Sequence, residues 1–122
     1  MALDAVIYTR DDQEFEDMKR ILQEEHEGIR VERDPMDGHG HYGYAYGIVV
    51  AAIDGARGME IVLEWSKRYK RTPIIWITSD PDFAGMAIRR HIFDFIIRPY
   101  TESRFRDAVR EAIRRAPQRD AL

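Results

Sequence analysis

The chain has 122 residues, of which 44% are hydrophobic and 34% charged, and a formal net charge of −3. Because it contains no cysteine, a disulfide scaffold, a thiolate metal site and a cysteine nucleophile are all excluded. No apolar run approaches the ~18 residues of a membrane span, and the N-terminus lacks the basic and apolar segments of a secretory signal. We therefore expect a cytoplasmic protein with one domain at residues 1–116 and a loose tail at 117–122.

Charge is unevenly spread along the chain. The segment 11–34 carries ten acidic residues against four basic ones, whereas from Arg98 onward there are seven arginines and four acids. Such a dipolar surface suits protein partners as well as anionic ones. The basic stripe with interleaved aromatic residues that indicates nucleic-acid binding is missing, so we expect neither a nucleic-acid partner nor membrane contact.

Five short apolar segments predict the strands of a sheet. Four of them, at residues 5–8, 48–51, 74–77 and 95–97, are continuous runs rich in β-branched and aromatic residues. Such runs are typical of strands that are buried on both faces. The fifth segment, at residues 29–32, alternates between apolar and polar residues and predicts a strand with one solvated face.

Amphipathic segments with helical spacing separate these strands. The first follows Asp11 or Asp12 as a candidate N-cap, and the third begins at Asp80–Pro81, where proline suits the first helical position. The last ends at Ala116–Pro117. The expected apolar positions of the four helices are, in chain order, Phe15, Met18, Ile21 and Leu22; Met59, Val62, Leu63 and Ser66, flanked by Trp65 and Tyr69; Phe83, Met86 and Ala87; and Phe105, Ala108, Val109, Ala112 and Ile113.

Strands that alternate with helices predict parallel pairing through crossover helices. The expected fold is therefore α/β, a three-layer sandwich around a five-stranded parallel sheet. The segment 34–47 interrupts this alternation, because Pro35 and four glycines leave no amphipathic period there. We expect the helix between the second and third strands to be lost or reduced to a turn.

Two segments in the second half carry a family resemblance. Residues 72–79 read Thr-Pro-Ile-Ile-Trp-Ile-Thr-Ser, and residues 93–100 read Phe-Asp-Phe-Ile-Ile-Arg-Pro-Tyr. With a helix between them, these segments resemble the receiver domain of response regulators in two-component signalling. They are most similar to receivers that precede a LytTR-type DNA-binding domain. The resemblance implies a flavodoxin-like sheet with the strand order 2-1-3-4-5.

Receivers are phosphorylated on an aspartate, and this chain departs from the family at the matching positions. The acidic pair that binds Mg²⁺ after the first strand falls on Thr9 and Arg10, and the phosphoacceptor position at the end of the third strand is Ala52. The hydroxyl and the lysine that contact the phosphate correspond to Thr78 and Arg98, the latter a planar guanidinium in place of a compact ammonium. The resemblance thus implies a degenerate phosphorylation pocket without a metal or a cofactor.

Asp54, in the loop after the third strand, is the one carboxylate that the sequence places near this pocket. Three interpretations stay open: an ion pair with Arg10, Arg57 or Arg98, a relocated phosphoacceptor, or a contact to an anion or a partner. Since the acids of the family are replaced while Arg10 and Arg98 are present, we expect a pocket of net positive charge. Asp54 or a bound anion would neutralise it.

The loop 37–47 joins glycines to histidines and tyrosines. His39 and His41, with Asp37 beside them, are a weak metal-binding signal because no third ligand follows at a defined spacing. We expect a mobile, exposed loop. Its tyrosines are Tyr42, Tyr44 and Tyr46. The last is expected to pack at the third strand, while the first two either cover the gap left by the missing helix or form a partner-binding patch.

The sequence contains no nucleophile–base triad, phosphate-binding loop, dinucleotide-binding turn or zinc signature, so we do not expect an enzyme. The resemblance implies an atypical receiver without an output domain, natural or excised from a longer regulator, that acts through protein contacts without aspartyl phosphorylation. The alternatives are a phosphorelay receiver that uses Asp54 in an altered geometry and a small-anion sensor at the pocket.

The family resemblance also implies a surface for partners. In receivers the fourth helix, fifth strand and fifth helix form the dimer and signalling face, which corresponds to residues 81–91, 93–97 and 101–115. We expect this face to contact a protein partner or a second copy of the chain. Its expected exposed residues are Arg89, Arg90, His91, Tyr100, Arg104 and Arg106.

Overall fold

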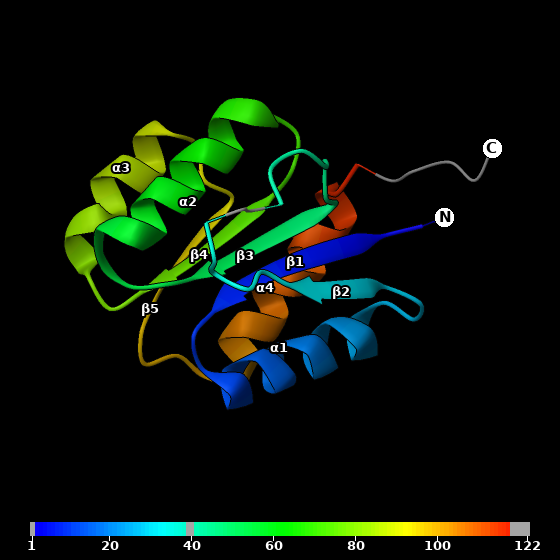
Figure 1. The fold of residues 1–122 in the computed structure, drawn as a ribbon. Coiled ribbons are helices and arrows are strands. Elements are labelled where there is room, and N and C mark those ends of the chain that lie inside the picture. Colours follow the sequence, from blue (N-terminus) through cyan, green and yellow to red (C-terminus); the bar gives the residue numbers. More distant parts are fainter. Residues whose placement is uncertain (1, 39–40, 118–122) are drawn as a thin grey trace.

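The protein, described here from a computed structural model of residues 2–38 and 41–117, is built around one sheet of five parallel strands (Figure 1). The strand order is β2-β1-β3-β4-β5, which confirms the predicted topology. The strands are β1 (Asp4–Thr9), β2 (Arg30–Arg33), β3 (Ile48–Ala52), β4 (Ile74–Thr78) and β5 (Asp94–Ile97). The helices are α1 (Asp12–Glu25), α2 (Gly55–Arg68), α3 (Ala84–Arg89) and α4 (Glu102–Arg115), and a 3₁₀ turn, Pro81–Phe83, leads into α3.

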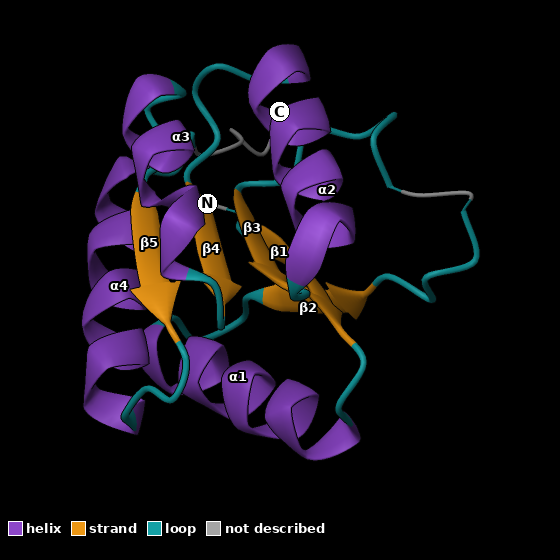
Figure 2. Cartoon of the chain, turned by 90° about the vertical axis from the view of Figure 1, so that its left-hand side faces the viewer, coloured by secondary structure: helices purple, strands orange, loops and turns teal. Residues whose placement is uncertain are grey.

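The sheet lies between two helical layers, with α1 and α4 on one face and α2 and α3 on the other (Figure 2). All residues of β1, β3 and β4 are buried. Side chains alternate between the two faces, so that Ile7 packs in the cluster that contains Phe105 of α4, whereas Tyr8 packs in the cluster that contains Trp65 of α2. The continuous apolar runs of β1, β3 and β4 therefore reflect burial on both faces, as predicted. The same prediction is wrong for the run 95–97, because β5 is largely half-buried and its Ile97 is 38% exposed.

Side-chain caps mark the start of α1, of α4 and of the 3₁₀ turn, whereas α2 begins without one. The Asp11 carboxylate accepts from the backbone N–H of Glu14 at 2.7 Å, and the hydroxyl of Thr101 accepts from that of Arg104 at 3.1 Å. Asp80 caps the third helical segment as predicted, although its first turn is 3₁₀ and α3 itself is only six residues long. In the described part of the chain, no helix has the length and apolar character needed to cross a membrane.

The predicted buried face of α2 is partly wrong. Its buried residues include Ile61, Val62 and Trp65, whereas Leu63 and Ser66 are only partly buried. The helix is apolar around much of its circumference, so periodicity alone does not fix its rotation. Gly58 fixes the approach of α2 to the sheet, since a β-carbon there would lie 1.8 Å from a backbone oxygen.

The segment 34–47 contains no helix in its described residues, as predicted, and residues 43–45 are exposed as expected, but His41 and Tyr42 are partly buried. Tyr42 packs against Trp65 with ring centroids 5.4 Å apart, and the Nδ1 atom of His41 lies 2.8 Å from the carboxylate of the buried Asp34. These aromatic contacts cover the place where a helix is missing. His39, and residues 118–122 of the expected tail, lie outside the described residues.

Candidate functional site

The carboxyl ends of four strands bring together most of the residues predicted for the pocket. Thr9 and Ala52 are paired across β1 and β3, the two neighbouring strands at which the chain order reverses. Thr78, at the end of β4, accepts the backbone N–H of Arg98 through its carbonyl at 2.9 Å. This edge of an open parallel sheet is where α/β folds hold their ligands.

Glu14 is the residue of this site that the sequence analysis missed. It lies in the first turn of α1, where the Asp11 cap holds its backbone. The Arg98 guanidinium binds the Glu14 carboxylate through both terminal nitrogens, with Nη1–Oε2 at 2.6 Å and Nη2–Oε1 at 3.0 Å. Nη2 also donates to the carbonyl of Ala52 at 2.8 Å. The guanidinium therefore contacts the backbone of Ala52, the residue that the sequence analysis aligned with the phosphoacceptor.

Two hydroxyls complete the hydrogen bonds of this carboxylate. Tyr100 donates to Glu14 Oε2 at 2.6 Å, and Thr9 donates to Oε1 at 2.7 Å. Burial opposes the charged form of the Arg98 guanidinium, but the Glu14 carboxylate outweighs it and raises the pKa of Arg98. Burial, together with the bond to Glu14, raises the pKa of the Tyr100 hydroxyl, which therefore stays protonated as a donor. The four side chains form a closed network of charge-assisted hydrogen bonds.

The expected net positive charge of the pocket is wrong, because the carboxylate of Glu14 neutralises the cation of Arg98 directly. In this pair the Glu14 side chain is 12% exposed and that of Arg98 26% exposed. Arg10 does not share in the network, since it is exposed and has no ion pair with a described carboxylate. Thr78 is fully buried, and its hydroxyl accepts from the backbone N–H of Asp80 at 3.3 Å.

Asp54 contacts the network only at its edge. Its carboxylate accepts from both the backbone N–H and the hydroxyl of Ser79, at 2.8 and 3.0 Å. The Arg98 Nε atom lies 3.5 Å from Asp54 Oδ1, close enough for an ion pair but without a hydrogen bond. Partial burial raises the pKa of Asp54, but the bonds from Ser79 and the charge of Arg98 outweigh it, and the pKa lies below its usual value. Arg57 pairs instead with Glu60, at 3.5 Å.

The residues at this edge do not fit the Mg²⁺ ion that receivers bind. Mg²⁺ requires oxygen ligands that are free to point at one ion. Here Glu14 is fully engaged by Arg98 and the two hydroxyls, and Asp54 is engaged by Ser79. Across the described residues, no group of three histidine, aspartate or glutamate side chains has a metal-binding arrangement. What remains is a cavity of about 310 Å³ lined by Thr9, Arg10, Asp11, Glu14, Ala52, Ile53, Asp54 and Arg98.

Four of the six residues predicted for the partner face are exposed, and two are partly buried. Arg89, Arg90 and His91 are exposed at the end of α3, and Arg104 is exposed but bound to Asp94 at 2.6 and 2.9 Å. Two of the predicted residues are engaged elsewhere and are not freely exposed. They are Tyr100, which binds Glu14, and Arg106, which binds Glu24 and Glu25 at 2.7 Å each. Ile88 and Ile97, which were not among the predicted residues of this face, are 76% and 38% exposed.

The sequence matches no protein-family model and no curated protein. Solved structures are similar in fold. HP1043, an orphan response regulator of H. pylori, is 11% identical, with 91% of this chain and 96% of that chain covered at a TM-score of 0.74. A signal receiver domain from Clostridium thermocellum is 19% identical, with 90% and 96% covered at 0.75. The response regulator DrrB of Thermotoga maritima is 17% identical, with 94% and 54% covered at 0.76. The chain therefore has the fold of response-regulator receiver domains.

Proposed function

We propose that this chain is a regulatory domain of the receiver type that acts through protein contacts and is not switched by aspartyl phosphorylation. The observation that carries the proposal is the ion pair between Glu14 and Arg98, which lies over Ala52. The sequence of residues 93–100 further supports a relation to the receivers of LytTR-type regulators.

The chemistry of phosphorylation supports this proposal. Transfer to a carboxylate needs the carboxylate as nucleophile and a cation that offsets repulsion by the incoming phosphate. Position 52 offers a methyl group, and the guanidinium above it is already neutralised by Glu14. Because the ion pair between Glu14 and Arg98 is formed without phosphorylation, no change in charge is available at this position to switch the conformation. We therefore expect one conformation at this end of the domain.

Protein contact would use the surface formed by α3, β5 and α4. Ile88 and Ile97 provide exposed apolar side chains there, and Arg89 provides an exposed cation at the end of α3. Isolated apolar side chains on a surface are ordinary, but these two lie on neighbouring elements of the face that serves receivers for dimerisation. A protein partner or a second copy of the chain would bury them.

The test is incubation with acetyl phosphate and Mg²⁺, followed by intact-mass measurement. We expect no mass increase, and no change in backbone amide chemical shifts when beryllofluoride replaces acetyl phosphate. The competing function is a phosphorelay that uses Asp54, whose side chain is 55% exposed. A gain of one phosphoryl group in the wild-type protein that disappears in Asp54→Asn would establish that relay and contradict our proposal.

A small-anion sensor at the pocket is less well supported by the geometry. Both terminal nitrogens of Arg98 already bind oxygen acceptors of Glu14 and Ala52, so an anion would have to displace the carboxylate. Titration with inorganic phosphate, followed by the amide shifts of Glu14 and Arg98, tests this. Saturable shifts at these residues would favour the sensor.

A further inference from the structure

A wide groove lies at the amino-terminal edge of the sheet, at the other end of the strands from the Glu14–Arg98 pair. It has a volume of about 1310 Å³ and is lined by the segments 69–74 and 89–93, which lead into β4 and β5, and by residues along α2 from Arg57 to Lys67. The parallel topology brings these segments together, because each helix runs back to the edge at which the next strand begins. We call this feature the basic groove.

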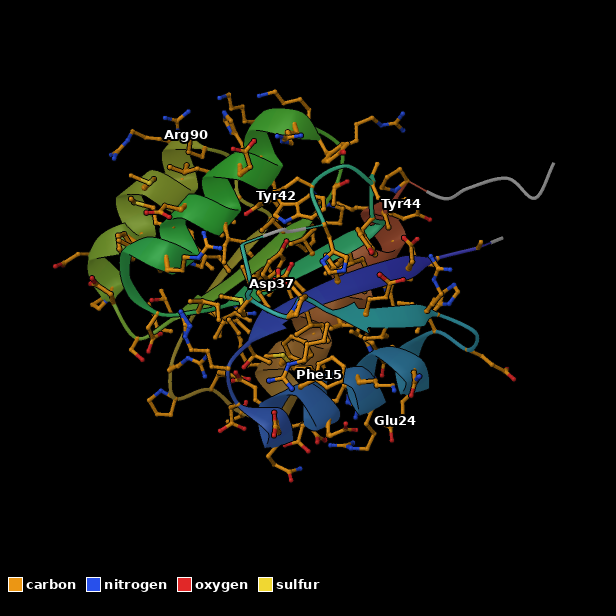
Figure 3. The ribbon with its side chains drawn as sticks, viewed as in Figure 1. Phe15, Glu24, Asp37, Tyr42, Tyr44 and Arg90 are labelled. Atoms are coloured by element: carbon orange, nitrogen blue, oxygen red, sulfur yellow. The ribbon has the colours of Figure 1, made fainter. Side chains whose placement is uncertain are left out.

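The charge of the basic groove is strongly unbalanced. Its two lining carboxylates, Glu60 and Glu64, are each paired with an arginine of α2, at 3.5 and 2.6 Å. Six lining cations have no ion pair with any carboxylate in the described residues. They are Lys67, Lys70, Arg71, Arg89, Arg90 and Arg115. Figure 3 shows one of them, Arg90, at the end of α3. Cations gathered without partners in one concave surface attract an anionic partner.

Stabilisation of the helix ends explains only part of this charge. Lys67 and Arg89 lie in the last turns of α2 and α3, where a positive side chain interacts favourably with the helix dipole. Lys70 and Arg71 lie beyond the end of α2, and Arg90 lies at the C-cap of α3. Interaction with a helix dipole therefore does not account for these three cations.

His91 supplies an independent observation at the rim of the groove. Its φ of +55° is left-handed, and the hydrogen bonds Ile92 N–Ala87 O at 2.9 Å and His91 N–Ile88 O at 3.2 Å form the helix-ending motif in which glycine is the usual residue. A side chain at this position is disfavoured by its β-carbon. The chain thus carries an imidazole at the groove at a cost in stability.

The size of the groove and its aromatic residues indicate the class of partner. Its volume exceeds the range of about 300–1,000 Å³ typical of small-molecule sites. The guanidinium of Arg68 lies 5.6 Å from the centroid of the Tyr42 ring, and that of Arg115 lies 5.4 Å from the Phe93 centroid. Single-stranded nucleic acid is held by bases that stack on free aromatic faces, and these rings are already covered. A negatively charged polypeptide needs no such faces.

We propose that the basic groove binds an acidic segment of a partner protein. The proposal rests on the proposed function in that the partner is a protein, but it concerns the opposite edge of the sheet and needs no phosphoryl transfer. A phosphoryl gain in the mass measurement would contradict the proposed function and leave peptide binding at the groove intact. Failure of peptide binding would contradict only the proposal that the groove binds an acidic segment.

The test is a titration of the full chain with a fluorescein-labelled oligoglutamate peptide, followed by fluorescence anisotropy at low and high salt. We expect saturable binding that weakens with salt, and no binding of an oligoglutamine peptide of the same length. Lys70→Glu and Arg90→Glu should each weaken binding by ~5–10-fold, since each replaces an attraction by a repulsion. Lys19→Glu on α1, away from the groove, is the control with the same change in charge and should leave binding unchanged.

His91→Gly separates binding from folding. It should keep or raise the thermal midpoint, because glycine suits the left-handed position, and it should weaken peptide binding. If Lys70→Glu and Lys19→Glu weakened peptide binding equally, the effect would come from the net charge of the protein and not from the groove, and the proposal would be wrong. Tighter binding of a single-stranded oligonucleotide than of oligoglutamate would overturn it in favour of a nucleic-acid surface.

Discussion

Glu14→Ala tests whether the closed network at the carboxyl edge stabilises the protein. The variant leaves the Arg98 guanidinium without its main partner and removes the acceptor of the Tyr100 and Thr9 hydroxyls. Removing one member of a fully buried ion pair costs about 3–5 kcal/mol, whereas exposed pairs contribute about 0.2–1 kcal/mol. With 12% of the Glu14 side chain and 26% of the Arg98 side chain exposed, we expect a loss of about 2–4 kcal/mol in unfolding free energy.

Urea denaturation followed by tryptophan fluorescence measures this loss, since Trp65 and Trp76 are fully buried in the core cluster that includes α2 and become exposed on unfolding. At ordinary urea dependences the midpoint should fall by about 1–3 M with an unchanged slope. Glu16→Ala is the matched control, because it removes an exposed carboxylate from the same helix. It should change the unfolding free energy by no more than about 0.5 kcal/mol.

A double-mutant cycle with Arg98→Met isolates the interaction between the two charges. If Arg98 and Glu14 are paired as in the structure, the double variant should be more stable than the sum of the two single losses predicts, by at least about 1 kcal/mol. Additive losses, or a Glu14→Ala variant as stable as the Glu16→Ala control, would refute the reasoning that the pocket is internally neutralised.

Three further predictions concern the packing and the charges that hold the site in place. Gly58→Ala should destabilise strongly, by about 1–3 kcal/mol or more, because its β-carbon would overlap a backbone oxygen, whereas Gly43→Ala has open space and should leave the thermal midpoint unchanged. Phe105→Ala should cost roughly 3–5 kcal/mol in chemical denaturation, since the ring is 1% exposed between α4 and the sheet; a near-wild-type midpoint would mean that α4 is not docked. Arg110 holds the pKa of Glu25 below its usual value of 4.5, so this pair stabilises the protein fully above that pH and loses its contribution as the pH falls further. Urea midpoints measured across this acid range should fall less steeply in Arg110→Met than in wild type.

The secondary structure was largely predictable because burial on both faces leaves a clear mark on the sequence. The apolar runs at 48–51 and 74–77 lie within β3 and β4, and the glycines of 34–47 correctly predicted the missing helix. The strand order came from the family resemblance and not from periodicity, since a parallel sheet of alternating elements has several possible orders. The rotation of α2 was not predictable, because Trp65 and Leu63 compete for the same buried layer and only the packed sheet decides between them.

The candidate site was predictable only where strand ends define it. Thr9, Ala52 and Arg98 each follow directly from the end of a strand, whereas Glu14 comes from a helix and lies 84 residues before its partner. An acid in the first turn of a helix also has an ordinary role at the helix dipole, so its type and position gave no signal of a pocket residue. The sequence contained one indication of a further acid in the pocket. The positive charge of Arg98 required a carboxylate partner, and Asp54 in the loop provides only a 3.5 Å contact.

The net charge of −3 is a poor guide to how this domain meets other molecules, because the charges pair in space and not along the chain. Two acids of α1 are neutralised by α4, since Glu24 and Glu25 bind Arg106 at 2.7 Å, while Arg20 of α1 binds Glu102 of α4 at 2.6 Å. At the carboxyl edge of the sheet, the charge of Arg98 is neutralised by its ion pair with Glu14. At the amino edge, Lys70, Arg71 and Arg90 of the basic groove have no carboxylate partner among the residues that the structure describes. If the basic groove binds an acidic segment as we propose, the attraction originates at the end of the sheet that lies away from Ala52, and it does not depend on phosphorylation.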